Sequence, residues 1–243
     1  MKKVLMVIKK APTPAILTII SFVLFLVVYL FINLTTVEPY WFIGLVFALP
    51  FISFGFVTYL TTKDKINKAS SEVISLILTI ALGFVSLYSF FNIAIAAATT
   101  ETTDVNKYQR VLRITNYPKN RLTKHFPRVI PDNANNISFR YHPAFMQGGE
   151  ELILKFETSS VTINQYINDF KDKVIWTGNI NDNPSAFGII IPGFGEFGYK
   201  SLPEDFIIYV FLSDNSNHGE LSLVAISKVR NEIIFYAENW WYC

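Results

Sequence analysis

The sequence predicts an α+β membrane protein, in which a three-helix transmembrane anchor precedes one soluble domain with an antiparallel sheet and one packed helix. The first observation is that three long stretches, residues 15–34, 41–61 and 73–98, contain no charged residue. The second is an abrupt change after Ala98 to a charged, turn-rich chain with the apolar alternation of β-strands. Together they divide the chain into an anchor and a domain at residues 99–243.

Each uncharged stretch is long enough to cross a bilayer as an α-helix. A helix rises about 1.5 Å per residue, so about 20 residues cross a hydrocarbon core of about 30 Å. The first stretch exceeds the apolar core of a signal peptide, and no small-x-small cleavage pattern follows it. Small residues at 94–98 resemble such a pattern, so cleavage of the anchor near Ala98 stays an open alternative.

The lysines predict how the anchor is oriented. Residues 1–14 and 62–72 are rich in lysine, residues 35–40 contain none, and only three basic residues follow the third span closely. Cytoplasmic segments carry the excess of Lys and Arg, which predicts a cytoplasmic N-terminus and second loop. Three spans then place the C-terminal domain outside the cytoplasm. The basic residues concerned are Lys2, Lys3, Lys9, Lys10, Lys63, Lys65 and Lys68, against Lys107, Arg110 and Arg113.

The predicted spans favour anchoring over transport. Transporters and proton pumps carry ionisable side chains within their spans, and these three stretches have none. Ser86, Ser89 and Asn92 recur every three residues on one side of the third span. Such a polar stripe packs either among the chain's own helices or against a helix of another protein.

The soluble domain is predicted to be an antiparallel sheet of five or six strands, covered on one face by a helix. Residues 162–174 have the apolar spacing of an amphipathic helix, with a capping box from Thr162 to Gln165. The turn at 147–150 contains two glycines, expected to supply positive φ angles. The predicted strands are residues 137–141, 151–157, 187–191, 206–212, 220–228 and 232–237.

A short basic segment, residues 104–115, follows the third span. Val105, Tyr108, Leu112 and Thr115 share one helical face, with three basic residues elsewhere around the helix. Such a segment either lies on lipid headgroups or forms the first helix of the domain, packed on the sheet.

The segment from His125 to Tyr141, continued by Pro143, Phe145 and residues 147–149, resembles a stretch of extracytoplasmic domains from low-GC Gram-positive bacteria. Those domains are tethered by a lipid or by membrane spans. The resemblance implies a location at the cell surface and implies no particular activity.

An aromatic and glycine-rich loop is the candidate interaction site. Residues 193–198 fit G-x-G-x-x-G, but no regular helix or βαβ unit is predicted around them, so no cofactor is expected. The aromatic side chains either cover the edge of the core or face a ligand, and joint exposure would mark an interaction surface. These side chains are Phe187, Phe194, Phe197 and Tyr199.

Other patterns in the domain give no catalytic or metal site. His125, His142 and His218 are far apart and lack the spacing of metal ligands. Residues 214–219 resemble the start of a calcium loop but are expected to form a hairpin turn, because Ala225 stands at the twelfth position. The acidic pairs Glu150–Glu151 and Glu204–Asp205 are expected to be solvated, and Cys243 is the only cysteine.

Two functions of different classes follow from these patterns. The first is a membrane-anchored extracytoplasmic binding or protein-interaction module, alone or as an accessory subunit of a membrane complex. Its expected partner is a membrane or surface protein rather than nucleic acid. The alternative is a surface hydrolase whose site gathers His125 or His142 with carboxylates from distant segments. Neither the ligand nor the oligomeric state follows from the sequence.

Overall fold

The computed structural model describes residues 2–145, 149–187, 189, 192 and 194–240 of the 243-residue chain. The chain divides into two compact units, Met1–Ala97 and Ala98–Cys243. The division falls next to the boundary expected from the change in composition at Ala98.

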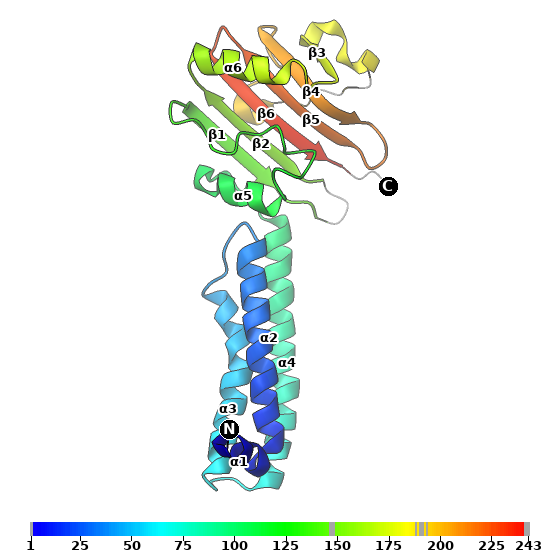
Figure 1. The fold of residues 1–243 in the computed structure, drawn as a ribbon. Coiled ribbons are helices and arrows are strands. Elements are labelled where there is room, and N and C mark those ends of the chain that lie inside the picture. Colours follow the sequence, from blue (N-terminus) through cyan, green and yellow to red (C-terminus); the bar gives the residue numbers. More distant parts are fainter. Residues whose placement is uncertain (1, 146–148, 188, 190–191, 193, 241–243) are drawn as a thin grey trace. The chain divides into compact units, whose positions relative to one another are not determined.

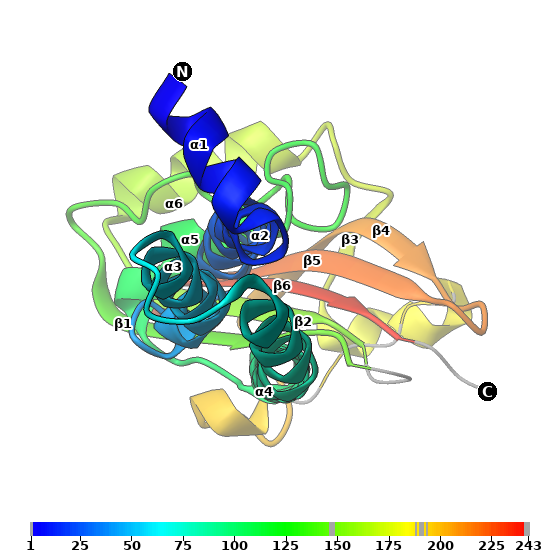
Figure 2. The ribbon, with the colours of Figure 1, turned by 90° about the horizontal axis from the view of Figure 1, so that it is seen from below.

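The described residues of the first unit form helices joined by short connections (Figure 1). Three of its helices, Pro12–Thr35, Ile43–Thr62 and Lys68–Thr99, are long and apolar enough to cross a membrane. Figure 2, which looks along these helices, shows them as neighbouring columns, with α1 turned away from the axis of α2. The elements are α1 (Lys2–Lys10), α2 (Pro12–Thr35), the 3₁₀ helix η1 (Ile43–Ala48), α3 (Leu49–Thr62) and α4 (Lys68–Thr99).

Aromatic side chains hold α2 against α3, whereas α4 makes less contact. Phe51 of α3 packs on both Phe22 and Phe25, with ring centroids 5.3 and 5.4 Å apart. Only 6% of the most apolar window of α4 is buried, against 28% for the span Ile43–Thr62. An apolar hollow of about 480 Å³ is lined by residues of α2, η1, α3 and α4.

The polar stripe on α4 is split between two environments. Ser86 lines the apolar hollow, toward the chain's own helices. Ser89 is half-buried, whereas Asn92 is exposed, and the Asn92 amide donates to the Tyr88 carbonyl at 2.8 Å within α4. Of the three residues, only Asn92 is therefore left exposed by packing within the unit.

The second unit contains a six-stranded antiparallel sheet in the order β1-β2-β6-β5-β4-β3, which confirms the predicted fold class. The hairpin β1–β2 pairs with β6 through β2, and β4, β5 and β6 follow one another as a meander. The strands are β1 (Asn135–His142), β2 (Glu151–Glu157), β3 (Trp176–Gly178), β4 (Phe206–Asp214), β5 (Glu220–Ser227) and β6 (Glu232–Asn239).

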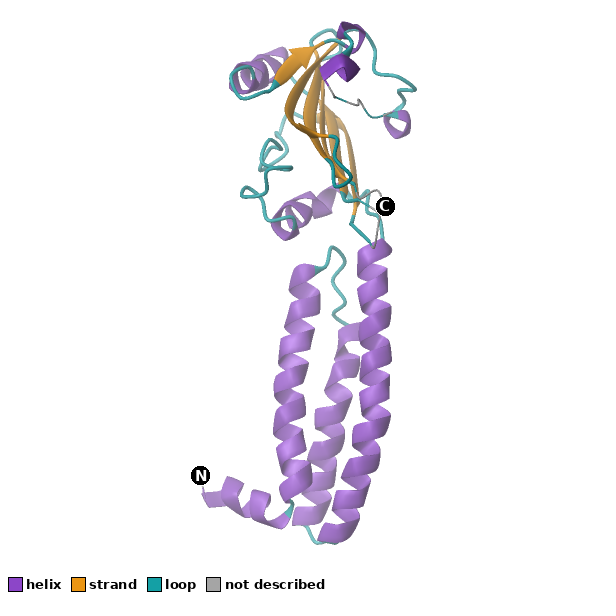
Figure 3. Cartoon of the chain, turned by 90° about the vertical axis from the view of Figure 1, so that its right-hand side faces the viewer, coloured by secondary structure: helices purple, strands orange, loops and turns teal. Residues whose placement is uncertain are grey.

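The predicted helix covers one face of the sheet, and irregular chain, for which no expectation came from the sequence, covers the other (Figure 3). We call the two faces the helix face and the loop face. The helix face carries α5 (Tyr108–Ile114) and α6 (Ser160–Phe170). The loop face carries the connection from β3 to β4, which contains the 3₁₀ helices η3 (Ile180–Asp182), η4 (Pro184–Phe187) and η5 (Gly195–Phe197).

The central strands explain why a second cover is needed. Residues 221–227 of β5 are all buried, and so are residues 232–237 of β6. A strand whose alternate side chains are both apolar must be shielded from water on both faces. The irregular connection from β3 to β4 therefore packs on the sheet as a third layer.

Two predicted elements differ from those observed. The strand expected at 187–191 is wrong in its described part, because Phe187 ends η4 and Ile189 is buried outside any strand. The edge strand is instead β3, paired to β4. The helix expected from Thr162 begins at Ser160, since Ser159 is the cap whose hydroxyl accepts from the Thr162 amide at 3.2 Å.

Candidate functional site

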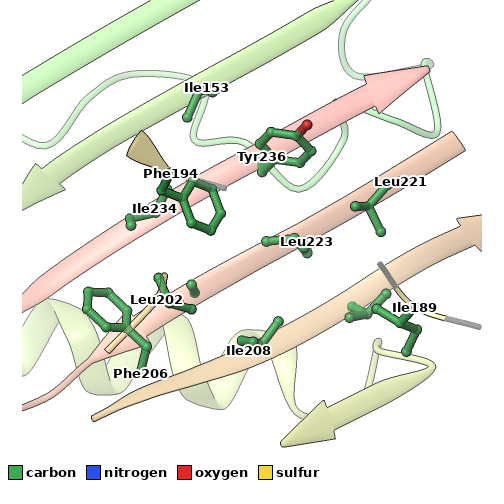
Figure 4. Close-up of a cluster of buried hydrophobic side chains, with 12 residues drawn as sticks. Ile153, Ile189, Phe194, Leu202, Phe206, Ile208, Leu221, Leu223, Ile234 and Tyr236 are labelled. Carbon is green, nitrogen blue, oxygen red and sulfur yellow. The ribbon is translucent and has the colours of Figure 1, made fainter. Parts of the chain in front are cut away.

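The aromatic loop predicted as an interaction site packs largely onto the loop face (Figure 4). Phe194 is 1% exposed and meets Tyr236 edge to face, with ring centroids 5.8 Å apart. Phe197 and Tyr199 are partly buried against the same cluster. The Phe187 side chain and Gly193 of the glycine motif lie outside the described residues. Phe194 therefore contributes core rather than surface.

A buried ion pair fastens this loop to the sheet. Lys155 of β2 lies 3.2 Å from Glu232 of β6, and the two side chains are 15% and 5% exposed. The Lys155 ammonium also donates to the Phe197 carbonyl at 3.1 Å and lies 4.8 Å from the centre of the Tyr199 ring. The Tyr199 hydroxyl donates to Glu232 at 2.9 Å. Burial, together with that hydrogen bond, raises the pKa of Tyr199 to about 12.

A second ion pair extends the network at the edge of the loop face. Arg230 lies 3.0 Å from Asp205, and its guanidinium is 5.8 Å from the centre of the Tyr199 ring. The Ser227 hydroxyl donates to Asp205 at 2.5 Å, and this bond holds the pKa of Asp205 below its usual value. Because each charge already has a partner, the network can clamp the loop but offers no open group to a ligand.

His125 is buried in an aromatic cluster on the helix face. Its ring stacks on Phe211 with centroids 5.0 Å apart, and Nδ1 lies 2.9 Å from the Ser222 hydroxyl. Burial lowers the pKa of His125 to about 3, so the ring is neutral. Ser222 is itself 0% exposed, so this serine–histidine pair is a packing contact out of reach of a substrate.

Three ionisable residues, His142, Glu151 and Glu238, form a row across the sheet near the end of β1, which we call the acidic row. His142 of β1 stands opposite Glu151 of β2, which stands opposite Glu238 of β6. The Tyr236 hydroxyl donates to Glu238 at 2.5 Å, and Arg140 lies 3.5 Å from Glu151. Within the described part of the chain, no group of three or more such side chains could hold a metal ion.

The acidic pair at 150–151 is less solvated than expected. Glu151 is paired with Arg140, and burial raises the pKa of the Glu150 carboxyl, which bonds the Tyr141 hydroxyl. The turn at 214–219 is the β4–β5 hairpin, in which the Ser216 amide donates to Asp214 at 2.9 Å. His218 is exposed in that turn, and Cys243 lies outside the described residues.

A strongly basic segment lies on the helix-face side of the domain. Residues 105–131 contain seven Lys and Arg and no Asp or Glu, whereas the rest of residues 98–243 contains seven basic and 16 acidic residues. Five of the seven are exposed, and Arg121 is paired with Glu220. The seven are Lys107, Arg110, Arg113, Lys119, Arg121, Lys124 and Arg128.

This segment encloses a surface hollow of about 540 Å³, which we call the basic hollow. Its lining residues are Gln109, Leu112, Arg113, Tyr117, Arg128 and Val129. Arg113 and Arg128 are exposed and have no ion pair among the residues that the structure describes. The basic hollow thus presents two guanidinium groups that are open to an anion.

Local packing brings the two arginines together. Helix α5 buries Tyr108, Val111 and Leu112 and turns Arg113 outward. Helix α5 packs on the sheet, where Tyr108 meets Phe139 edge to face, as expected for the first helix of the domain, and it leaves its Arg113 side open to other contacts. The Tyr108 hydroxyl donates to the Pro127 carbonyl at 2.5 Å, which fixes the residue before Arg128 beside α5.

A smaller hollow of about 290 Å³ lies against the edge strand β1. It is lined by Thr103, Ile137, Ser138, Phe139, Arg140 and Phe197. Arg140 is already held by Glu101, 2.9 Å from its Nε atom. Phe197 of the predicted aromatic loop thus borders a hollow.

The sequence reasoning did not identify the basic hollow. It singled out Lys107, Arg110 and Arg113 as a helical surface, whereas Arg128 comes from a loop that carries no periodic signal. The signal that could have found the site is the run from 105 to 131 without a single carboxylate.

These features define a class of protein: three candidate membrane-spanning helices followed by an antiparallel α+β domain with a basic surface hollow. Comparisons with protein-family models, curated proteins and solved structures found no match to this chain.

Proposed function

We propose that the chain is a membrane-anchored extracytoplasmic binding module, alone or as an accessory subunit of a membrane complex. Its binding site is the basic hollow, and its partner is an anionic component of the membrane or cell surface. The observation that carries the proposal is the pair Arg113 and Arg128, which line one hollow without a carboxylate partner in the described chain.

The chemistry of arginine supports an anionic partner. A guanidinium group presents a planar set of donors that fits the two oxygens of a carboxylate or phosphate, and it remains charged at any physiological pH. Gln109 and Tyr117 add polar side chains to the same lining, while Leu112 and Val129 add apolar ones. Such a mixture suits a ligand that has both an anionic and an apolar part.

The extracytoplasmic orientation is supported by the lysine distribution and by one ion pair. Lys10 at the end of α1 lies 2.6 Å from Asp64, which follows α3. The two lysine-rich segments therefore meet at one end of the first unit, as expected if both lie in the cytoplasm. The resemblance of residues 125–149 to tethered extracytoplasmic domains agrees with this orientation.

A surface hydrolase is the second candidate, and the acidic row is the feature of the described residues that favours it. His142, Glu151 and Glu238 stand opposite one another across three strands, as a site assembled from distant segments requires. Neither the basic hollow nor the hollow beside β1 is lined by any of these three residues. A binding module therefore accounts for the surface better than a hydrolase does.

Photo-crosslinking in native membranes tests the proposed function. A photoreactive amino acid at Gln109, inside the basic hollow, is compared with the same group at Ser216 in the exposed β4–β5 turn. Crosslinked products specific to position 109 that disappear in the Arg113→Gln/Arg128→Gln variant are expected. Products at 109 that persist unchanged in that variant would exclude the arginines as the binding site.

A further inference from the structure

We infer that the anionic partner of the basic hollow is the phosphate headgroup of anionic phospholipids in the membrane that holds the anchor. This inference rests on the proposed function and names the ligand of the same site. It makes residues 105–131 a docking surface by which the domain is held on the bilayer.

The covalent chain keeps the basic hollow within reach of a bilayer. Helix α4 ends at Thr99, and its apolar sequence continues to Ala98, which places the end of this candidate span at the membrane surface. Helix α5 begins at Tyr108. A chain extends at most about 3.5 Å per residue, so residues 100–107 allow α5 to lie no more than about 30 Å from that surface.

The surface of the segment has the composition of a membrane-binding site. Val129 is 56% exposed beside the two open arginines, and such an apolar side chain can enter the headgroup region once the arginines contact phosphate. Lys119 and Lys124 are also exposed and have no ion pair among the described residues. Each basic residue near an anionic membrane strengthens its attraction about fivefold.

A lipid explains the site better than a soluble anion. A small phosphate would use the two arginines but not the exposed valine or the two further lysines. A bilayer presents many phosphates over a wide area, with an apolar interior beneath them, and can contact all of these groups together. The absence of carboxylates over residues 105–131 removes the repulsion that such an extended anionic surface would otherwise meet.

Fluorescence of the full chain in vesicles provides the test. A Cys243→Ser/Val129→Cys variant carries an environment-sensitive fluorophore at position 129 and is reconstituted in phosphatidylcholine, with or without phosphatidylglycerol. In the anionic vesicles we expect a blue shift of the emission and an increase of at least about twofold in its intensity. Salt at about 1 M should reverse both changes, because it shortens the screening length to about 3 Å. Arg113→Gln/Arg128→Gln should abolish the change.

The matched control is Lys171→Gln/Lys173→Gln, which removes the same charge from exposed positions after α6. This control should keep the full fluorescence response to anionic vesicles. An equal loss of the response in both double variants would attribute the binding to net charge alone. A third arm adds inorganic phosphate to phosphatidylcholine vesicles. A response to phosphate without a response to phosphatidylglycerol would overturn the lipid inference while leaving the proposed function intact. A response to neither would overturn the inference too, and the crosslinking at Gln109 would then decide the proposed function separately.

Discussion

At the scale of single residues, burial of His125 in the aromatic cluster should make the stability of the domain depend on pH. The ring lies against Phe126, Phe211 and Phe235, and its Nδ1 meets the Ser222 hydroxyl. Burial favours the neutral ring and lowers its pKa from 6.5 to about 3. The unfolded chain therefore binds more protons than the native chain between these two values.

The soluble domain should consequently lose stability in acid. Stability from the neutral ring is complete above pH 6.5 and declines as the pH falls toward 3. In His125→Phe, the decline of the unfolding midpoint over this range should be smaller, because no titrating ring remains. Near-UV circular dichroism of the full chain during denaturation at several pH values measures it. An unchanged pH dependence in the variant would contradict a neutral, buried His125.

The ion pair beneath the loop gives a second prediction at this scale. Glu232→Gln leaves the ammonium of Lys155 largely buried without its counter-charge, and removing one partner of a buried pair costs about 3 kcal/mol. Lys155→Met/Glu232→Leu should recover much of this loss, because neither charge then remains. Unfolding in urea measures the free energies.

An exposed ion pair supplies the comparison. Arg121 pairs with Glu220 but its side chain is 63% exposed, so Arg121→Gln should change the free energy of unfolding by less than about 1 kcal/mol. If Glu232→Gln were as mild as Arg121→Gln, the network would not hold the loop on the sheet.

At the scale of elements, the β1–β2 hairpin closes against the end of β6. Gly149 makes this possible, since a Cβ atom there would lie 1.5 Å from the backbone oxygen of Asn239. The glycine is needed for close approach and has no positive φ, contrary to the role expected from the turn. The Asn239 amide donates to the Glu150 carbonyl at 3.0 Å across the same contact.

Gly149→Ala should therefore destabilise the domain by about 2 kcal/mol or more, because backbone rather than a flexible side chain must move. Gly195→Ala in η5 is the matched control, since a Cβ atom there meets nothing within 4 Å. Thermal unfolding of both variants provides the measurement. Equal midpoints would show that the hairpin does not depend on this approach.

Periodicity explains which elements could be predicted from the sequence. The hairpin and the strands β4, β5 and β6 combine β-branched and aromatic residues with clear turns, and the helix α6 has regular apolar spacing. The cover of the loop face has no period, because it consists of short 3₁₀ helices and irregular chain. The uninterrupted apolar run at residues 223–226 of β5 was the sign in the sequence that a second cover exists.

The basic hollow could not be predicted from the sequence for a different reason. Arg113 lies on α5 and Arg128 in a loop, and tertiary contacts such as the hydrogen bond from Tyr108 to the Pro127 carbonyl bring them together. Phe194 and Tyr199 were easier to notice in the sequence because they lie in one aromatic run. That run serves mainly the core and the buried ion pair.

At the scale of the whole molecule, the predicted anchor has long uncharged stretches, whereas the domain is charged and carries the basic hollow. The predicted spans 15–34, 41–61 and 73–98 contain no Asp, Glu, Lys, Arg or His, which favours the anchoring role that the proposed function gives them. The basic hollow can serve an extracytoplasmic binding module only if the second unit lies outside the cytoplasm. Export of the domain is the central requirement of the proposed function.

Cysteine labelling in intact cells tests that requirement directly. In a Cys243→Ser background, single cysteines are placed at Ser216, exposed in the β4–β5 turn, and at Lys65, between the second and third spans. A membrane-impermeant maleimide should label position 216 before lysis and position 65 only after permeabilisation. Labelling of position 65 in intact cells, with position 216 protected until lysis, would contradict an extracytoplasmic binding module.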